Sequence, residues 1–253
     1  MALAVTLITG ASAGLGAEFA RQCAARGEEL ALVARRRDRM EALAKEIGGT
    51  VHIFAADLAR EGAAASLIAE LAAEGLTVET LINNAGFGLG GAFADRPLGR
   101  LSEMIDLNCR TLAELCHLVL PGMRSAGKGA ILNVASTAAF QPGPKMAVYF
   151  ATKAFVLSLS EALHEELKPH GIKVSCLCPG PTRTEFGEVA GFGGNGAFDR
   201  LAMGAAEVVE IGLDGLDKNK AVVIAGLVNK IGAWSTRFAP RSTVRRIAGA
   251  IKY

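Results

Sequence analysis

The chain has 253 residues, of which 51% are hydrophobic and 21% charged, and its formal net charge is +2. This length suits one α/β domain with a full-sized core, and the nearly balanced charge argues against a dedicated nucleic-acid-binding protein. The five cysteines are odd in number and include no C-x-x-C pair, so we expect a reducing, cytoplasmic setting with neither a disulfide framework nor a metal site.

Short apolar or β-branched runs alternate along the chain with longer segments of helical periodicity. This alternation predicts a doubly wound α/β fold, in which helices cover both faces of a parallel sheet. No stretch outside glycine-rich sequence approaches the roughly 18 uninterrupted apolar residues of a membrane-spanning helix. We expect a single domain over residues 1–253 with seven parallel strands, at 4–9, 30–34, 51–56, 80–83, 130–135, 172–178 and 221–226.

The first predicted strand runs directly into a glycine-rich turn and a helix. The stretch TLITGASAGLG, from Thr6 to Gly16, contains three spaced glycines at the carboxyl end of this strand. Bare backbone there lets a diphosphate approach the N–H groups of a helix N-terminus, which predicts a dinucleotide site; a plain strand-to-helix turn is the alternative. The residues of the turn that we expect to contact the cofactor are Gly10, Ser12, Gly14, Leu15 and Gly16.

The second predicted strand ends in the basic sequence VARRR, residues 33–37. A site for NAD places an acidic residue here to bind the ribose hydroxyls, but this chain has Ala34. Arg35 and Arg36 follow, and a guanidinium forms charge-assisted hydrogen bonds with a 2′-phosphate, so we expect NADP rather than NAD. A solvated, basic start of the next helix is the alternative.

Tyr149 and Lys153 stand four residues apart on a predicted helix at about 147–168, so both lie on one face of it. A phenol has a pKa of about 10, and a nearby ammonium lowers that pKa, which suits a group that exchanges a proton with a carbonyl oxygen. Ser136 lies just past the strand at 130–135 and precedes this pair. An ordinary surface pair of tyrosine and lysine is the alternative.

Five motifs occur in chain order: TGASAGLG at 9–16, Asp57–Leu58, NNAG at 83–86, YFATK at 149–153 and PGPTRT at 179–184. The glycine spacing is T-G-x-x-x-G-x-G rather than the commoner G-x-G-x-x-G. With the other motifs it resembles the short-chain dehydrogenase/reductase family, in its subclass of this length, over nearly the whole chain. The resemblance implies a Rossmann-type fold and a nicotinamide-dependent oxidoreductase.

The resemblance also implies a catalytic set. In it Tyr149 passes the proton, Ser136 donates a hydrogen bond to the substrate oxygen, and Lys153 also holds the nicotinamide ribose. Asn108, a polar residue in an apolar helical pattern, would bind a water that links Lys153 to solvent. A buried amide bonded to neighbouring backbone is the alternative for Asn108.

Further cofactor contacts follow from the same resemblance. Asp57 would contact adenine, although it could equally be a helix N-cap, and Thr184 would contact the diphosphate unless it only caps a loop. Many NADP-using relatives have a basic residue where this chain has Ala13, so Arg35 would provide most of the discrimination. Besides the glycine turn, Arg35 and Arg36, the expected contacts are Asp57, Leu58, Asn84, Ala85, Gly86, Tyr149, Lys153, Pro179, Gly180, Thr182 and Thr184.

A glycine-rich loop at about 185–204 follows the sixth predicted strand and could close over the substrate. Its Phe186, Phe192 and Phe198, with Phe87 and the segment 139–146, predict an apolar pocket. We therefore expect an NADP(H)-dependent reductase or dehydrogenase for an apolar ketone, aldehyde or alcohol. The alternatives are a 3-oxoacyl-thioester reductase of the same family, a non-catalytic dinucleotide-binding regulator, and a methyltransferase, which would leave the Tyr–Lys pair unexplained.

Two features predict partners. The expected helices at about 98–125 and 147–168 carry apolar residues on more than one face, which indicates a homodimer or homotetramer unless these faces are buried within the subunit. The C-terminal segment 226–253 belongs to a stretch that has no acidic residue from Lys218 onward. The eight basic residues of this stretch are Lys218, Lys220, Lys230, Arg237, Arg241, Arg245, Arg246 and Lys252.

The end of this segment has the periodicity of an amphipathic helix. Val244, Ile247, Ala248 and Ile251 recur at helical spacing beside basic residues. The stripe either packs on the subunit or supports weak docking on an anionic membrane or an acidic carrier.

Overall fold

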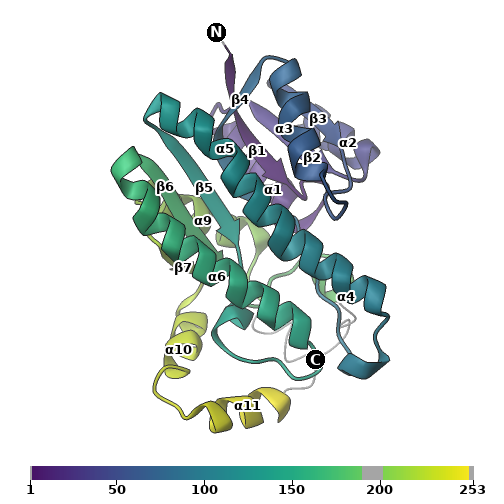
Figure 1. The fold of residues 1–253 in the computed structure, drawn as a ribbon, viewed down its shortest axis with the longest axis vertical. Helices are drawn as coiled ribbons and strands as arrows, with labels where there is room; N and C mark the ends of the chain where they lie inside the picture. The colour runs from purple at the N-terminus through teal and green to yellow at the C-terminus, as the bar shows by residue number, and fades with distance from the viewer. Residues whose placement is uncertain (1, 190–201, 251–253) are drawn as a thin grey trace.

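The computed structural model describes residues 2–189 and 202–250. Its seven strands form one sheet in the order β3-β2-β1-β4-β5-β6-β7, and every pairing is parallel. The doubly wound α/β prediction is therefore confirmed (Figure 1). The strands are β1 (Leu3–Thr9), β2 (Leu30–Ala34), β3 (Val51–Ala55), β4 (Leu76–Asn83), β5 (Gly129–Val134), β6 (Ile172–Cys178) and β7 (Val222–Ile224).

Helices cover both faces of this sheet. Figure 1 shows α5 and α6 crossing the near face side by side, with α10 and α11 beyond the lower end of the sheet. The helices are α1 (Gly14–Ala25), α2 (Arg37–Ile47), α3 (Ala63–Ala73), α4 (Leu98–Ile105), α5 (Leu112–Ala126), α6 (Ala147–Leu167), α7 (Phe186–Val189), α9 (Ala205–Asp217), α10 (Leu227–Ser235) and α11 (Arg241–Ala250). No helix within the described residues is long and apolar enough to cross a membrane.

The two cores follow from the alternation of side chains along each strand. In β2, Ala31 and Val33 belong to the buried cluster that includes residues of α3, α5 and α6, whereas Leu30 and Leu32 belong to the one that includes residues of α1, α2 and α9. Successive strand residues point to opposite faces, so a strand buried on both faces must be apolar throughout. This is why the strands read as continuous apolar runs.

Two predicted elements differ in extent. β4 begins at Leu76 instead of residue 80, because its first part pairs with Leu3–Val5 of β1 ahead of a register shift. The predicted continuous helix at 98–125 is interrupted by a π-helical segment, η2 (Asp106–Thr111), between α4 and α5. Such a segment inserts a residue into the helical ladder and is common at functional sites.

The C-terminal segment contains two helices, and the expected amphipathic stripe lies on the second. In α11, Val244 and Ala248 are buried, but Ile247 is exposed, so Ile247 is not part of the packed face. Ile251 lies outside the described residues. The large exposed apolar side chains of this segment are mainly on and just after α10, which the sequence reading did not single out: Leu227, Val228, Ile231, Trp234 and Phe238.

Candidate active site

The glycine turn after β1 is shaped by its own packing. A Cβ on Gly16 would overlap the carbonyl oxygen of Gly10, and a Cβ on Gly10 would lie 2.9 Å from Asn84 Nδ2. The Asn84 amide donates to the carbonyls of Thr9 at 3.0 Å and Gly10 at 3.3 Å, which ties β4 to the turn. Close packing within the protein therefore leaves no room for a side chain at Gly10 or Gly16.

The N-terminus of α1 is available to an anion. Its N-cap residue Ala13 makes no side-chain capping bond, and the first turn contains no acidic residue. The N–H groups at Gly14, Leu15 and Gly16 are thus not capped by a side chain, and a helix N-terminus favours negative charge. These residues fit the diphosphate of a dinucleotide.

Thr9 joins the carboxyl ends of β1 and β4. The Thr9 hydroxyl accepts hydrogen bonds from the backbone N–H groups of Asn84 and Ala85, at 3.0 Å and 2.9 Å. The chain crosses from β3 at one edge of the sheet to β4 on the other side of β1, which makes this the topological switch point. Ligands of doubly wound sheets bind at that point.

Tyr149, Lys153 and Ser136 meet at the carboxyl end of β5. Tyr149 and Lys153 occupy successive turns of α6, and Lys153 Nζ lies 5.8 Å from the centroid of the Tyr149 ring. The ammonium donates to the carbonyl of Val134 at 2.8 Å. The Ser136 hydroxyl is hydrogen-bonded to the phenol, donates to Pro179 O at 3.4 Å, and accepts from Ala138 N at 3.1 Å.

The pKa values of this pair differ from the sequence prediction. Burial raises the pKa of Tyr149 to about 12, against the smaller opposing effect of the hydrogen bond with Ser136. Burial also lowers the pKa of Lys153 to about 8. The expectation that the ammonium lowers the phenol pKa is wrong for the protein alone, because desolvation disfavours both charged forms and Nζ is directed to the carbonyl of Val134.

Asn108 lies in the π-helical segment and is buried. Its Oδ1 accepts from Phe87 N at 3.1 Å, while its Nδ2 donates to Phe87 O at 3.0 Å and to the Thr152 hydroxyl at 3.1 Å. The bonding to neighbouring backbone that the sequence left as an alternative is therefore present. Asn108 also lies near Lys153, because both side chains approach Gly86. A Cβ added to Gly86 would lie 2.9 Å from Asn108 Oδ1 and 3.6 Å from Lys153 Nζ.

The arginines after β2 point in different directions. Arg35 is largely exposed, and its Nη1 lies 3.9 Å from Glu103 of α4. Arg36 instead reaches the glycine turn, with its Nε and Nη2 3.4 Å and 3.3 Å from Ser12 Oγ. Arg36 is the arginine that the structure brings to the turn, whereas the sequence reading gave Arg35 the larger part.

Asp57 and Leu58 follow the carboxyl end of β3. Asp57 Oδ1 accepts from Ala59 N at 3.2 Å and so stabilises a turn, but it does not cap α3, whose N-cap is Gly62. Leu58 is buried, and its carbonyl accepts from the Thr111 hydroxyl at 2.6 Å.

The PGPTRT segment crosses the end of β6. The carbonyl of Pro179 accepts from Thr137 N, and Thr182 donates to Gly180 O at 3.0 Å. The Thr184 side chain packs on the glycine turn, since a Cβ on Gly14 would lie 3.4 Å from Thr184 Cβ. Its hydroxyl also accepts from Phe186 N at 3.3 Å, so both the packing against the turn and the loop cap occur.

An apolar cluster surrounds the phenol. Tyr149, Met146 and Phe150 are buried together with Leu101 and Met104 of α4. The Phe186 ring lies 5.4 Å from the Tyr149 ring, and Phe87 packs at the border of the cluster. Most of the expected closing loop, including Phe192 and Phe198, lies outside the described residues.

Four residues that the sequence did not suggest contribute to this region. Arg39 and Glu185 form an ion pair beside Arg36, with Arg39 Nη1 2.7 Å from Glu185 Oε1. Asn133 of β5 joins Asn83 of β4 to Ser160 of α6 through hydrogen bonds of 2.9 Å and 3.0 Å. Each pair joins segments far apart in the chain, so no local pattern could indicate it.

Comparison with known proteins agrees with this geometry. A sulfoacetaldehyde reductase of Chromohalobacter salexigens is 39% identical over 201 residues, which cover 78% of this chain and 80% of that protein. A very-long-chain 3-oxoacyl-CoA reductase of Phaeosphaeria nodorum is 37% identical over 68% of this chain and 52% of that protein, so the chain spans about half the length of this curated relative.

Solved structures extend the similarity to the C-terminal segment. A short-chain dehydrogenase from Sphingobium yanoikuyae in complex with NADPH has 35% identity and a TM-score of 0.82, with coverage of 99% of this chain and 97% of that one. The family model described as short chain dehydrogenase matches residues 4–191. The chain therefore belongs to the short-chain dehydrogenase/reductase family.

Proposed function

We propose that the protein is a cytoplasmic NADP(H)-dependent oxidoreductase that interconverts an apolar ketone or aldehyde and the corresponding alcohol. One observation carries the proposal. Tyr149, Ser136 and Lys153 lie together near the topological switch point of the sheet, where the glycine turn leads into an α1 N-terminus that no side chain caps. A nicotinamide held at this site would supply the hydride that the carbonyl carbon needs for reduction.

Tyr149 supplies the proton in that direction. Its raised pKa keeps the phenol protonated at neutral pH, so it can transfer a proton to the oxygen as the C=O π bond breaks and the O–H bond forms. Ser136 lies beside the phenol and can donate a second hydrogen bond to the same oxygen. Lys153 lies one helical turn away, and its ammonium would stabilise the phenolate that remains once it turns from the Val134 carbonyl toward the ring oxygen.

The cofactor preference rests on charge. Ala34 leaves no carboxylate at the end of β2. The Arg36 guanidinium reaches Ser12 of the glycine turn, and the Arg39 guanidinium pairs with the same Glu185 carboxylate as Arg36 does. These groups suit a 2′-phosphate, and they support NADP over NAD. The NADPH complex of the Sphingobium relative is consistent with this preference.

The substrate proposal rests on the apolar cluster at Tyr149, formed with Met146, Phe150 and Phe186. The relatives reported above are named for a small sulfonated aldehyde and for very-long-chain 3-oxoacyl-CoA, so membership of the family does not by itself set the substrate. A 3-oxoacyl-thioester reductase is the second candidate, favoured by the latter relative.

The test is a Tyr149→Phe variant assayed by NADPH absorbance with ketones, aldehydes and 3-oxoacyl thioesters. Loss of the proton donor lowers kcat by roughly 10²–10⁴-fold. NADPH binding, followed by fluorescence titration, should stay within a factor of two, because the phenol is not placed at the diphosphate turn. Full turnover by the variant would contradict the mechanism. Wild-type binding of NADH equal to or tighter than that of NADPH would contradict the cofactor.

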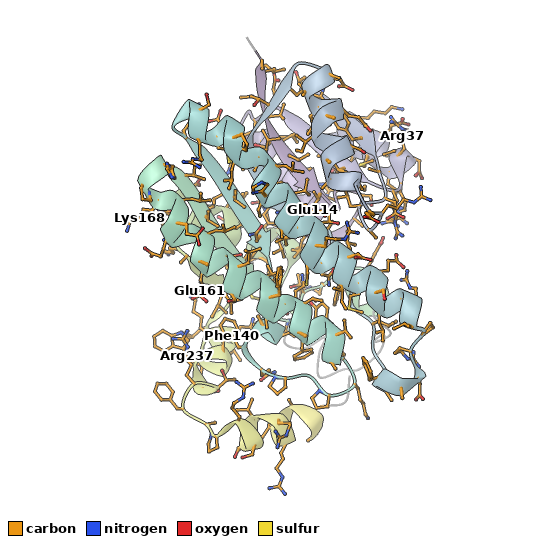
Figure 2. All side chains as sticks on the ribbon, in the orientation of Figure 1. Arg37, Glu114, Phe140, Glu161, Lys168 and Arg237 are labelled. Atoms are coloured by element: carbon orange, nitrogen blue, oxygen red, sulfur yellow. The ribbon has the colours of Figure 1, made fainter. Side chains whose placement is uncertain are left out.

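The C-terminal segment supports a proposal about partners. The exposed apolar side chains of α10 lie beside exposed basic residues, with no acidic residue from Lys218 to Ala250, and Figure 2 shows Arg237 at the outer edge of this segment. We infer weak, reversible docking on an anionic lipid surface, to which each basic residue contributes on the order of 1 kcal/mol. A second copy of the chain bound through this same patch would bring basic residues close to basic residues, which disfavours self-association there.

Trp234 is the single tryptophan of the chain, so its emission reports docking directly. We expect a blue shift with vesicles that contain phosphatidylglycerol, a smaller one with phosphatidylcholine alone, and loss of the difference at high salt. Phe238→Glu should weaken the binding, whereas Phe93→Glu, at a side chain that is 63% exposed outside the C-terminal segment, should not. Equal emission with both vesicle types would rule out the membrane and leave an acidic carrier to be tested.

A further inference from the structure

Glu185 joins two parts of the proposed cofactor cleft. It lies after β6, in the segment that precedes α7, and reaches the start of α2 across the glycine turn. Its Oε1 is 2.7 Å from Arg39 Nη1, and its Oε2 is 3.5 Å from Arg36 Nη2. Arg36 in turn donates to Ser12 of the glycine turn at 3.3 Å. One carboxylate thus bridges two guanidiniums at the carboxyl end of β2.

The same guanidiniums are those available to a 2′-phosphate. In a doubly wound sheet the adenosine ribose lies at the end of β2, next to the glycine turn. Carboxylates and phosphates bind guanidinium through the same N–H donors, so the two groups compete for them. The hydrogen bond from Arg39 holds the pKa of Glu185 below its usual value, so the carboxylate is charged at neutral pH.

The neighbours of Glu185 connect this contact to the rest of the site. Thr184 packs on Gly14 of the diphosphate turn, and Phe186 lies against the Tyr149 ring. Three consecutive residues therefore touch the diphosphate turn, the arginines and the catalytic phenol. The ion pairs of Glu185 therefore help to set the position of residues 184–186 between the diphosphate turn and the catalytic phenol.

We propose that Glu185 is an internal competitor of the 2′-phosphate and therefore a residue that determines cofactor specificity. Its bridge must open before NADP(H) can use both Arg36 and Arg39, whereas NAD(H) has no anionic group at this end to displace it. Arg39, which makes the shorter contact, is then the second phosphate ligand beside Arg36. The proposal rests on the NADP(H) preference argued above.

The experiment is isothermal titration calorimetry of the full chain with adenosine 2′,5′-bisphosphate and, separately, with AMP, which lacks the 2′-phosphate. Glu185→Gln removes the competitor, so we expect the bisphosphate to bind about three- to fivefold more tightly, in keeping with the size of an exposed ion pair. AMP affinity should change by less than a factor of two, because AMP does not contact the bridge.

Glu41→Gln is the matched control. It removes the same charge from α2, but Glu41 pairs with Arg37 at 3.8 Å, and Figure 2 shows Arg37 at the outer edge of the molecule. We expect this variant to bind both nucleotides as the wild type does. An equal gain in Glu41→Gln would mean that only long-range charge is at work and would overturn the proposal.

Arg39→Gln tests the second half of the proposal. It should weaken bisphosphate binding, and the gain from Glu185→Gln should shrink in the Arg39→Gln background, because the two residues act through one contact. Bisphosphate binding by Glu185→Gln equal to or weaker than wild type would overturn the competitor role. A wild type that does not distinguish the bisphosphate from AMP would instead overturn the NADP(H) preference itself, which is a different result.

Discussion

Lys153 is a buried ammonium that the fold holds beside a buried phenol. Only 6% of its surface is exposed, and the Val134 carbonyl is its hydrogen-bond acceptor. Burial brings its pKa to about 8, while that of Tyr149 rises to about 12. The two residues therefore titrate in separate pH ranges, and the lysine is the one that changes charge near physiological pH.

This separation predicts the pH dependence of catalysis. Because the folded pKa of Lys153 is lowered to about 8, its charge is present below that pH and lost above it. The kcat/KM for NADPH, which reports groups of the free enzyme, should fall as the pH rises through about 8. Tyr149 remains protonated over this range, so the phenol adds no second limb between pH 9 and 11.

Lys153→Arg provides the control for this assignment. A guanidinium keeps its charge throughout the range, so any activity that the variant retains should show no fall near pH 8. A descending limb that persists near pH 8 in the variant would assign the titration to another group.

At the scale of the elements, a series of side-chain hydrogen bonds, called here the amide ladder, joins β4, β5 and α6. Asn83 of β4 donates to Asn133 of β5, which donates to Ser160 of α6, whose hydroxyl donates to the Val156 carbonyl at 2.6 Å. Asn133 and Ser160 have no exposed surface. Polar groups in such a setting are stabilising only as a complete set, because each unpaired member keeps its desolvation cost. The ladder lies directly beneath the strand ends that hold Ser136 and Gly86.

Replacing Asn133 with leucine should therefore be costly. The change removes the nearest acceptor of the Asn83 amide, which keeps only the longer contacts to Cys116 Sγ at 3.3 Å and Leu112 O at 3.5 Å, and it leaves the Ser160 hydroxyl without its donor. We expect a loss of about 2–4 kcal/mol in the free energy of unfolding. Ser160→Ala, which removes one end of the ladder, should cost less. Urea unfolding followed by circular dichroism at a fixed protein concentration measures both, and an Asn133→Leu variant as stable as the wild type would contradict the role of the ladder.

At the scale of the whole molecule, large exposed apolar side chains lie on two separate groups of helices. One group is α4 and α6, where Leu98 is 77%, Ile105 48% and Phe155 42% exposed. The other is the α10 surface, where Phe238 just after the helix is 85% exposed. The first has mixed charge around it and suits a second copy of the chain, whereas the second lies in a stretch, 218–250, whose charged residues are all basic.

We accordingly expect a homodimer or larger assembly through α4 and α6. Phe155→Glu should shift the mass measured by multi-angle light scattering at micromolar concentration toward the monomer, because it places a charge in an apolar contact. Phe238→Glu should leave the mass unchanged. A wild type that is monomeric under these conditions would refute the assembly, and dissociation by Phe238→Glu would place the interface on α10 instead.

The sequence by itself determined the strands, the glycine turn and the Tyr149–Lys153 pair. Each is a local pattern: strands buried on both faces are apolar throughout, close backbone approach requires glycine, and residues four apart share a helix face. The start of β4 could not be predicted in this way. Thr77 and Glu79 interrupt the apolar run, and only the pairing with β1 extends the strand to Leu76.

The tertiary structure alone decided which arginine reaches the glycine turn, which carboxylate opposes it, and how the catalytic pair titrates. Glu185 meets Arg39 across 146 positions of the chain, and Asn133 meets Asn83 across 50. The raised pKa of Tyr149 and the lowered pKa of Lys153 come chiefly from desolvation, which depends on everything packed around them. Charge pairing and burial are properties of distance in space, and sequence spacing does not encode them between distant segments.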